Sequence, residues 1–325
     1  MKNIFGNLIE IHNRYLDSFE VGKVVVDNKD YIIIKAINPN GEYDGYSFNE
    51  KREISKIKSN GKYLGFMNKL QNMNVDNLSF ETKEEIISYA IVNSKLLYVT
   101  SSTWCYYKII KPIIIQGKNL TYHPINYYGK VLEEKSISID LLFHVEIDTK
   151  RLITFERYFA NQLNINNSNS KKLIEVYENC LDKFDVGEIQ VSNPEFLLIK
   201  SYNSYGEYDG YIYQEKKTIT KMKSNSNYLK FLEKIILEND KELIFDNKES
   251  ILELAFNDKR LLSISYGKSE CYYDIKIVSL NKSSISFQII MQTGQLGKEK
   301  IININKITYL KIDSIELRAL ERVLL

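Results

Sequence analysis

The sequence predicts a mainly β protein with short helices, built by tandem duplication of one unit. The stretch GEYDGY at Gly41 to Tyr46 recurs unchanged at Gly206 to Tyr211. Residues from 8 onward align without a gap with residues from 173 onward for about 60 positions, and roughly half of the pairs are identical. Short β-branched or aromatic runs separated by turn clusters fill each copy. We expect two repeat units, 1–160 and 172–325, joined by an exposed Asn- and Ser-rich linker at 161–171.

The first half of each unit is predicted to be a helix, four or five short strands and a closing helix. The opening segment, Asn3 to Tyr15, carries apolar residues at helical spacing. Tyr63, Leu64 and Phe66 predict the closing helix from Lys62 to Gln71. The strands predicted between these helices are Gly22 to Val26, Tyr31 to Ile37, Gly45 to Phe48 and Ile54 to Lys58.

The second half repeats this plan. Thr82 to Asn93 starts with a threonine N-cap and has two glutamates in its first turn, which predicts an amphipathic helix. A helix is also predicted for KRLITFERYF and for Ser314 to Leu325 at the end of the second copy. Five strands are predicted between these helices: Leu96 to Ser101, Tyr106 to Ile115, Leu120 to Asn126, Lys135 to Ile139 and Phe143 to Ile147. The whole chain is thus expected to contain four small barrels, at about 15–72, 82–160, 180–237 and 247–325.

The pattern FEVGKVVVDNKDYIIIKAINPNGEYDGYSF resembles the SH3-like or Sm-like small β-barrels of uncharacterised Gram-positive bacterial proteins. In that pattern a Val-Gly precedes an alternating strand, and a G-x-Y-D-G turn leads into the next strand. The resemblance covers residues 17–67 and 182–232. It implies a binding role, with RNA or protein as the partner.

Composition indicates a cytoplasmic protein. The 44 basic and 42 acidic side chains nearly cancel, so the net charge of +2 neither attracts nor repels nucleic acid. Three cysteines form no paired framework, which is typical of a reducing compartment. Apolar runs are too short for a membrane helix, so no membrane contact is expected.

The repeated motif supplies the first candidate site. Its glycines permit a turn or bulge, its aspartates can bond backbone amides, and its tyrosines can flank the bend. Alternatively, two equivalent Tyr-Asp-Tyr edges contact two equivalent features of a partner, since tyrosine suits interfaces. The residues concerned are Tyr43, Asp44 and Tyr46 in the first copy and Tyr208, Asp209 and Tyr211 in the second.

An aromatic cluster, WCYY at Trp104 to Tyr107, is the second candidate. We align its CYY with Cys271 to Tyr273 after a one-residue slip, which places Glu270 opposite Trp104. Such a cluster is either a strand entering a core or a platform on which a base or a partner side chain stacks, through Trp104, Tyr106 and Tyr272.

Repeated lysines are the third candidate. Lys56 and Lys58, and likewise Lys221 and Lys223, are expected on one side of a strand. They either contact phosphates or form the solvated face of an edge strand.

No catalytic residue, metal site or cofactor is predicted. His12, His123 and His144 lie far apart in the sequence, the recurring cysteines have no recurring histidine to activate them, and no phosphate-binding glycine loop occurs.

We expect a non-enzymatic binding protein whose partner is another protein, for example an immunity or inhibitor protein that blocks a toxin or defence enzyme. The alternatives are an Sm-like binder of RNA or single-stranded nucleic acid, and a small-ligand or enzyme site in a cleft between the repeats. A pseudo-twofold monomer is favoured over a homodimer, because the duplication already supplies the second copy.

Overall fold

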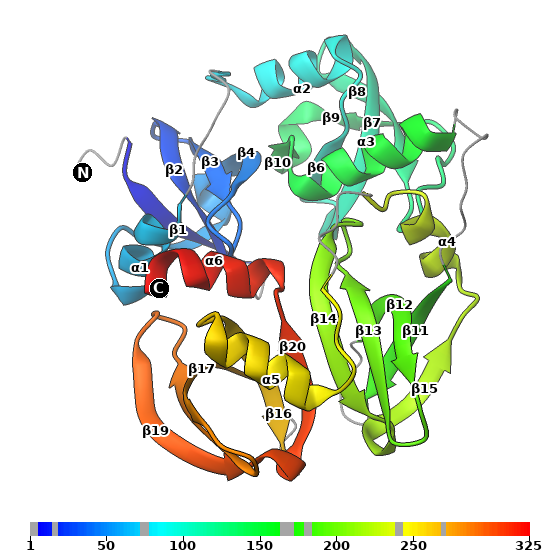
Figure 1. The fold of residues 1–325 in the computed structure, drawn as a ribbon. Coiled ribbons are helices and arrows are strands. Elements are labelled where there is room, and N and C mark those ends of the chain that lie inside the picture. Colours follow the sequence, from blue (N-terminus) through cyan, green and yellow to red (C-terminus); the bar gives the residue numbers. More distant parts are fainter. Residues whose placement is uncertain are drawn as a thin grey trace. The chain divides into compact units, whose positions relative to one another are not determined.

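A computed structural model describes residues 6–14, 19–71, 78–162, 172–178, 184–237, 243–267 and 271–325. The chain separates into two compact units, Met1–Asn164 and Ile165–Leu325 (Figure 1). Each unit contains a ten-stranded antiparallel sheet and three α-helices among its described residues. The mainly β class and the tandem duplication are thereby confirmed. Most of the predicted linker, 161–171, lies outside the described residues.

The first unit orders its strands β5-β1-β2-β3-β4-β10-β6-β7-β8-β9. Its strands are β1 (Leu8–Asn13), β2 (Phe19–Asp27), β3 (Tyr31–Ile37), β4 (Tyr43–Glu50), β5 (Ile54–Lys58), β6 (Leu97–Ser101), β7 (Trp104–Gln116), β8 (Asn119–Ile125), β9 (Lys135–Ser138) and β10 (Leu142–Ile147). Its helices are α1 (Lys62–Leu70), α2 (Lys83–Val92) and α3 (Lys150–Gln162).

The second unit repeats this order as β15-β11-β12-β13-β14-β20-β16-β17-β18-β19. Its strands are β11 (Leu173–Glu178), β12 (Phe184–Ser192), β13 (Phe196–Tyr202), β14 (Tyr208–Glu215), β15 (Ile219–Lys223), β16 (Leu261–Tyr266), β17 (Tyr273–Leu280), β18 (Ser284–Ile290), β19 (Leu296–Asn303) and β20 (Ile307–Ile312). Its helices are α4 (Asn227–Glu233), α5 (Lys248–Asn257) and α6 (Ile315–Leu324).

Each sheet consists of two five-stranded halves that share one order: fifth, first, second, third and fourth strand. A short 3-10 turn connects the fourth strand to the fifth in every half, at Lys51–Glu53, Ile139–Leu141, Lys216–Thr218 and Ile304–Lys306. The fourth strand of the first half pairs with the fifth strand of the second half. This pairing places Tyr46 opposite Ile147 and Tyr211 opposite Ile312.

The prediction of four small barrels is therefore corrected to two continuous sheets. A strand has two hydrogen-bonding edges, and those of β4 are used by β3 and β10, while those of β10 are used by β4 and β6. Pairing of β4 with β5, or of β9 with β10, would close a ring. Within the described ranges neither pairing occurs in the first unit, and the second unit follows the same order.

The described part of the opening segment contains the strand β1 and not the predicted helix. β1 pairs with β2 on one edge and with β5 on the other. Its Ile9 and Ile11 are fully buried, because both contribute to the core of the first half. β-branched residues favour this central position over a helix.

Helix α2 follows its prediction closely. The Thr82 side chain accepts the N–H of Glu85 at 3.2 Å, which caps the helix. Ile86, Ile87 and Ala90 are fully buried against the sheet of the second half, where α2 packs on β7 and β10. In the described parts of the chain every helix is too short or too polar to cross a lipid bilayer.

Candidate functional site

The GEYDGY motif begins the fourth strand in the first half of each unit. Tyr46 is fully buried and its hydroxyl donates to a backbone carbonyl, while Tyr211 is buried and its hydroxyl accepts a backbone N–H at 3.1 Å. Tyr43 and Tyr208 are half-buried, and each packs edge to face on the buried tyrosine with ring centroids 5.9 Å apart. The same aromatic pair thus recurs in both cores.

The aspartates of the motif cap the N-termini of helices α3 and α6. Asp44 Oδ1 accepts the N–H of Lys150 at 2.7 Å in the first turn of α3, and Asp209 Oδ1 accepts the N–H of Ile315 at 2.9 Å in the first turn of α6. Each carboxylate pairs an N–H that has no partner within its helix and lies at the positive end of the helix dipole. Burial raises the pKa of Asp44, although the hydrogen bond from Lys150 opposes this effect.

The second glycine of the motif brings two strands unusually close. Gly45 has φ +83°, and a Cβ there would lie 2.1 Å from the carbonyl oxygen of Ile147. Gly210 has φ +86°, and a Cβ would lie 2.0 Å from the carbonyl oxygen of Ile312. Only glycine fits both the backbone conformation and the space.

These contacts argue against a partner-binding role for Tyr46 and Tyr211. Tyr46 and Tyr211 are 0% and 2% exposed, so neither ring can reach a partner. The aspartates are used as helix caps, each within its own unit. The joint between β4 and β10, which both units need in the same form, therefore accounts for the second glycine and the aspartate of GEYDGY.

The aromatic cluster is only partly covered. Trp104 is half-buried and packs against the core, and the ammonium of Lys108 lies 3.5 Å from its ring centroid. This cation occupies the face on which a base would stack. Tyr106 is exposed, whereas Tyr272 is partly exposed and donates its hydroxyl to Glu178. Glu270, the expected counterpart of Trp104, lies outside the described residues.

Strand pairing also corrects the one-residue slip in this region. Leu97 pairs with Ile110, and Leu262 pairs with Ile275, so the two copies keep the same spacing. Tyr107 packs edge to face on His144, and Tyr272 packs in the same manner on Tyr309. Tyr272 is therefore the counterpart of Tyr107, and Cys271 takes the position of Tyr106.

The repeated lysines divide into two kinds. Lys56 and Lys221 are exposed on the edge strands β5 and β15. Lys58 donates to the buried Glu10 at 2.5 Å, and Lys223 lies 3.4 Å from the equally buried Glu175. Because these two lysines already neutralise carboxylates, each strand offers less positive charge to phosphates than the sequence suggested.

A group of polar residues that the sequence did not reveal lies beside the β4–β10 joint of the first unit. We call Glu20, His144 and Glu146 the acid–histidine cluster; their ligand atoms lie within 4.8 Å of one another. His144 is 2% exposed, its Nε2 lies 2.8 Å from Glu146 and its Nδ1 lies 3.5 Å from Glu20. Burial alone would lower the pKa of His144, but the two carboxylates outweigh burial and raise it.

Hydrogen bonds hold the cluster in place. Glu20 accepts from Ser47 Oγ at 2.6 Å and from Asn13 Nδ2 at 3.2 Å. The Nδ1 of His144 lies 2.8 Å from Asn49 Oδ1. Ser47 and Asn49 come from β4, Glu20 from β2 and His144 from β10. Residues so far apart in the sequence meet only because β4 pairs with β10, and no local spacing signals this contact.

The second unit places different chemistry at the same positions. Tyr309 and Lys311 on β20 stand where the first unit has His144 and Glu146, because the two joints have the same register. The Nζ of Lys311 lies 2.6 Å from Asp209 Oδ2, and Asp185 also acts on its charge. Burial alone would lower the pKa of Lys311, but these two carboxylates outweigh burial and raise it.

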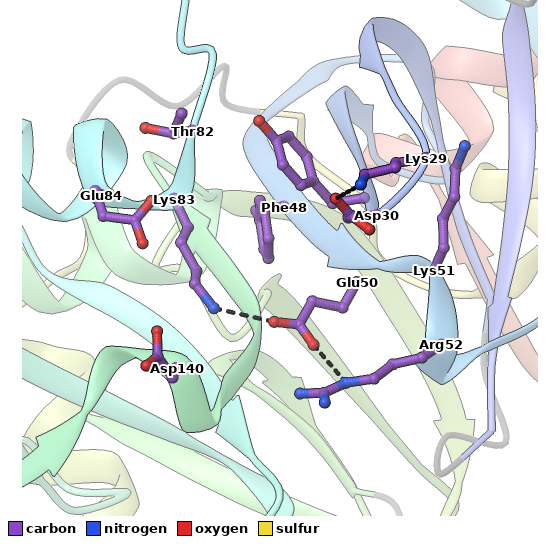
Figure 2. A pocket seen from close by; sticks show the side chains of 11 residues that line it. Lys29, Asp30, Phe48, Glu50, Lys51, Arg52, Thr82, Lys83, Glu84 and Asp140 are labelled. Atoms are coloured by element: carbon purple, nitrogen blue, oxygen red, sulfur yellow. Dashed lines mark hydrogen bonds and ion pairs between the residues drawn. The ribbon is translucent and has the colours of Figure 1, made fainter. Parts of the chain in front are cut away.

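An open cavity of about 460 Å³ lies between the two halves of the first unit (Figure 2). Glu50 lies at its centre, 3.0 Å from Lys83 Nζ and 2.7 Å from Arg52 Nε. Lys83 is buried and also donates to the carbonyl of Leu142 at 2.8 Å. The cavity is lined by Lys29, Asp30, Tyr31, Phe48, Glu50, Lys51, Arg52, Thr82, Lys83, Glu84 and Asp140.

The second unit repeats the central ion pairs of this cavity. Lys248 is buried and lies 3.4 Å from Glu215, which also contacts Lys217 at 2.5 Å. In both units the lysine opens a helix of the second half, and the glutamate ends a strand of the first half. We interpret these ion pairs as a structural link between the halves, because the central glutamate and lysine of each unit are already paired inside the protein.

An exposed apolar surface lies on the hairpin between the third and fourth strands of each second half. We call these two surfaces the hairpin surfaces. In the first unit the surface comprises Tyr127, Tyr128, Val131 and Leu132, with exposed fractions of 40–60%. In the second unit it comprises Met291 and Leu296, with exposed fractions of 51% and 42%.

Both hairpins have a fixed turn. In the first unit Asn126 N–H donates to the Lys130 carbonyl at 3.0 Å, and in the second Met291 N–H donates to the Gln295 carbonyl at 2.8 Å. The Arg151 guanidinium lies 5.6 Å from the ring centroid of Tyr127 and restrains that ring. The apolar side chains are thus presented on ordered backbone.

No protein-family model matches the chain, and no curated protein matches it significantly.

Proposed function

We propose that the chain is a non-enzymatic binding protein that recognises another protein through its hairpin surfaces. The observation that carries the proposal is the exposure of apolar side chains on the same hairpin in both units. Contiguous exposed apolar groups cost free energy in water and mark contact sites. Tyrosine, methionine and arginine, which are all found at or beside these surfaces, are enriched in protein interfaces.

Each five-stranded half, in this proposal, is an SH3-like or Sm-like module. The strand order and the 3-10 turn before the fifth strand recur in all four halves and support this assignment. In the partly open five-stranded barrel of the OB-fold, connecting loops contact the ligand. The third-to-fourth-strand hairpin of each second half is such a loop.

The partner we propose is a toxin or defence enzyme in the cytoplasm, which the protein blocks as an immunity or inhibitor protein. Two equivalent hairpin surfaces in one chain supply the two contacts that a homodimer would otherwise provide. A pseudo-twofold monomer is accordingly the expected state.

Affinity capture tests this function. The full-length chain is immobilised, incubated with lysate of its source cells, and bound proteins are identified by mass spectrometry. We expect one dominant partner, at least tenfold depleted with the double variants Tyr127→Ser/Tyr128→Ser and Met291→Ser/Leu296→Ser. Val92→Ser is the matched control, because Val92 is an 81% exposed apolar residue outside both surfaces.

Recovery of no partner by the wild-type chain would count against the proposal. So would equal recovery by the wild-type chain and the hairpin variants. All substituted side chains are well exposed, so far-UV circular dichroism should show an unchanged fold.

A further inference from the structure

We propose that the outer edge of β19 in the second unit accepts an antiparallel β-strand of the partner protein. This strand would have an aliphatic residue opposite Ile301 and an acidic residue opposite Lys300. The inference rests on the proposed function, because it gives the same protein partner a further contact. β19 begins at Leu296, which also belongs to the hairpin surface of the second unit, so the two contacts are continuous. Addition of a strand to an exposed sheet edge is a recurring mode of protein recognition.

The backbone of β19 is open on one side. β19 is the last strand of its sheet, and among the described residues only β18 pairs with it. The N–H of Ile304 donates to the carbonyl of Ser283 at 2.9 Å, which fixes the alternation along the strand. Successive residues of an antiparallel strand direct their N–H and C=O groups to opposite edges, so those of Glu299 and Ile301 face away from β18. This edge therefore offers donors and acceptors to an added strand.

Two other fourth strands of the chain already have such a neighbour. β4 and β14 have the same length and the same register shift as β19, so the three strands correspond residue by residue. β10 pairs with β4, and β20 with β14, along the edge that is open in β19. Ile301 stands where β4 has Phe48 and β14 has Tyr213. These two residues pair with Val145 and Leu310 of the added strands.

The exposure of Ile301 shows that its position lacks this neighbour. Its side chain is 72% exposed, whereas Phe48 and Tyr213 are 2% and 4% exposed and belong to the cores. The fourth strand of the other second half, β9, has only four residues and carries Ser136 at the corresponding position. Short polar edges discourage pairing. Of the two second halves, that of the second unit therefore keeps the edge suited to an added strand.

Charge determines which strand fits. β19 carries Lys298, Glu299 and Lys300, while its neighbour β18 has no charged residue. The carboxylate of Glu299 already accepts a hydrogen bond from Ser286. Both lysines are exposed, so this edge is positive and favours an acidic strand.

The chain itself contains one strand that matches this edge and one that does not. Lys300 corresponds to Ser47, which pairs with Glu146 of β10, and to Ile212, which pairs with Lys311 of β20. In the register of these joints, the β10 sequence places a carboxylate opposite Lys300, whereas the β20 sequence places an ammonium there. Opposite charges across a strand pair are stabilising, and like charges are destabilising.

A synthetic peptide with the β10 sequence DLLFHVEIDT, residues 140–149, is the probe. Fluorescence polarisation of the labelled peptide, titrated with the full-length chain, should show saturable binding. Ile301→Lys should weaken this binding at least about fivefold, because the aliphatic pair with Val145 is lost. Val92→Lys is the matched control and should bind as the wild type does, since Val92 is 81% exposed and lies outside β19. Absence of saturable binding, or equal binding by Ile301→Lys, would overturn the proposal.

A charge exchange tests the register. The peptide with Glu146→Lys should bind the wild-type chain about fivefold more weakly than the original peptide. Lys300→Glu in the chain should restore the binding of this altered peptide, because it returns an opposite charge to the pair. Equal binding of both peptides by the wild-type chain, or no restoration by Lys300→Glu, would contradict the proposed pairing.

Affinity capture separates this inference from the proposed function. Ile301→Lys should deplete the captured partner as the hairpin variants do. If Ile301→Lys recovers the partner as well as the wild type while the hairpin variants lose it, strand addition is wrong and the proposed function stands. If the peptide binds at β19 but no partner is recovered, the proposed function fails, while the role of β19 as a strand acceptor is supported.

Discussion

Replacement of Gly45 by alanine tests the close contact at the β4–β10 joint. An L-residue at φ +83° costs about 1–2 kcal/mol. A Cβ 2.1 Å from the Ile147 carbonyl oxygen forces the two strands apart, which costs about 1–3 kcal/mol. Alanine recovers about 0.4–1 kcal/mol by restricting the unfolded chain. The free energy of unfolding should therefore fall by about 1–5 kcal/mol.

Gly117→Ala is the matched control. Gly117 also has a positive φ, +60°, but its Cβ would meet nothing within 4 Å. Its substitution should cost at most about 1.5 kcal/mol, because only the backbone term applies.

Urea unfolding followed by tryptophan fluorescence measures both variants. Trp104 is the single tryptophan of the chain, so its emission reports on the first unit, in which both glycines lie. If Gly45→Ala and Gly117→Ala differ by less than about 0.5 kcal/mol, the close approach does not constrain the joint.

Two further predictions concern stability. Lys83→Met should lower the free energy of unfolding by about 2–3 kcal/mol in the same fluorescence assay. Glu50 and the Leu142 carbonyl both lose a buried donor, although Arg52 still pairs with Glu50. An unchanged unfolding midpoint would contradict the link between the halves. Burial alone would raise the pKa values of Glu10 and Glu175, but hydrogen bonds and nearby lysines lower both below the ordinary 4.5. The two carboxylates therefore stabilise the fold above about pH 4.5, and this stabilisation is lost as the pH falls through the lowered pKa values. Glu10→Gln should therefore flatten the fall in thermal midpoint below about pH 4.5, and a pH profile identical to that of the wild type would refute this role.

Local sequence signals predicted much of the fold. The Thr82 cap and the apolar face of α2 lie where the pattern placed them, and β3 and β5 have their predicted bounds. β1 was mistaken for a helix because Leu8, Ile9 and Ile11 suit either period, and its strand state depends on two neighbouring strands. Pairing with β2 and β5 therefore determines that this segment is a strand.

Long-range contacts explain what the sequence could not show. Pairing of β4 with β10 joins the halves, buries Tyr46 and brings His144 next to Glu20, yet no local pattern specifies it. The buried Lys83 gave no signal either, because a lysine in the first turn of a helix resembles a solvated residue until its partner Glu50 is known. The retained GEYDGY motif was recognised, but its role became clear only with its neighbours.

The most direct test asks whether the GEYDGY tyrosines are buried while the hairpin surfaces are exposed to solvent. Hydroxyl-radical footprinting of the full-length chain, with mass spectrometry of each residue, measures this. Tyr46 and Tyr211 should be protected, because they are 0% and 2% exposed. Tyr127 and Tyr128 should be modified rapidly, because they are 60% and 46% exposed. Modification of Tyr46 and Tyr211 as fast as that of Tyr127 would contradict the assignment of the motif to the interior.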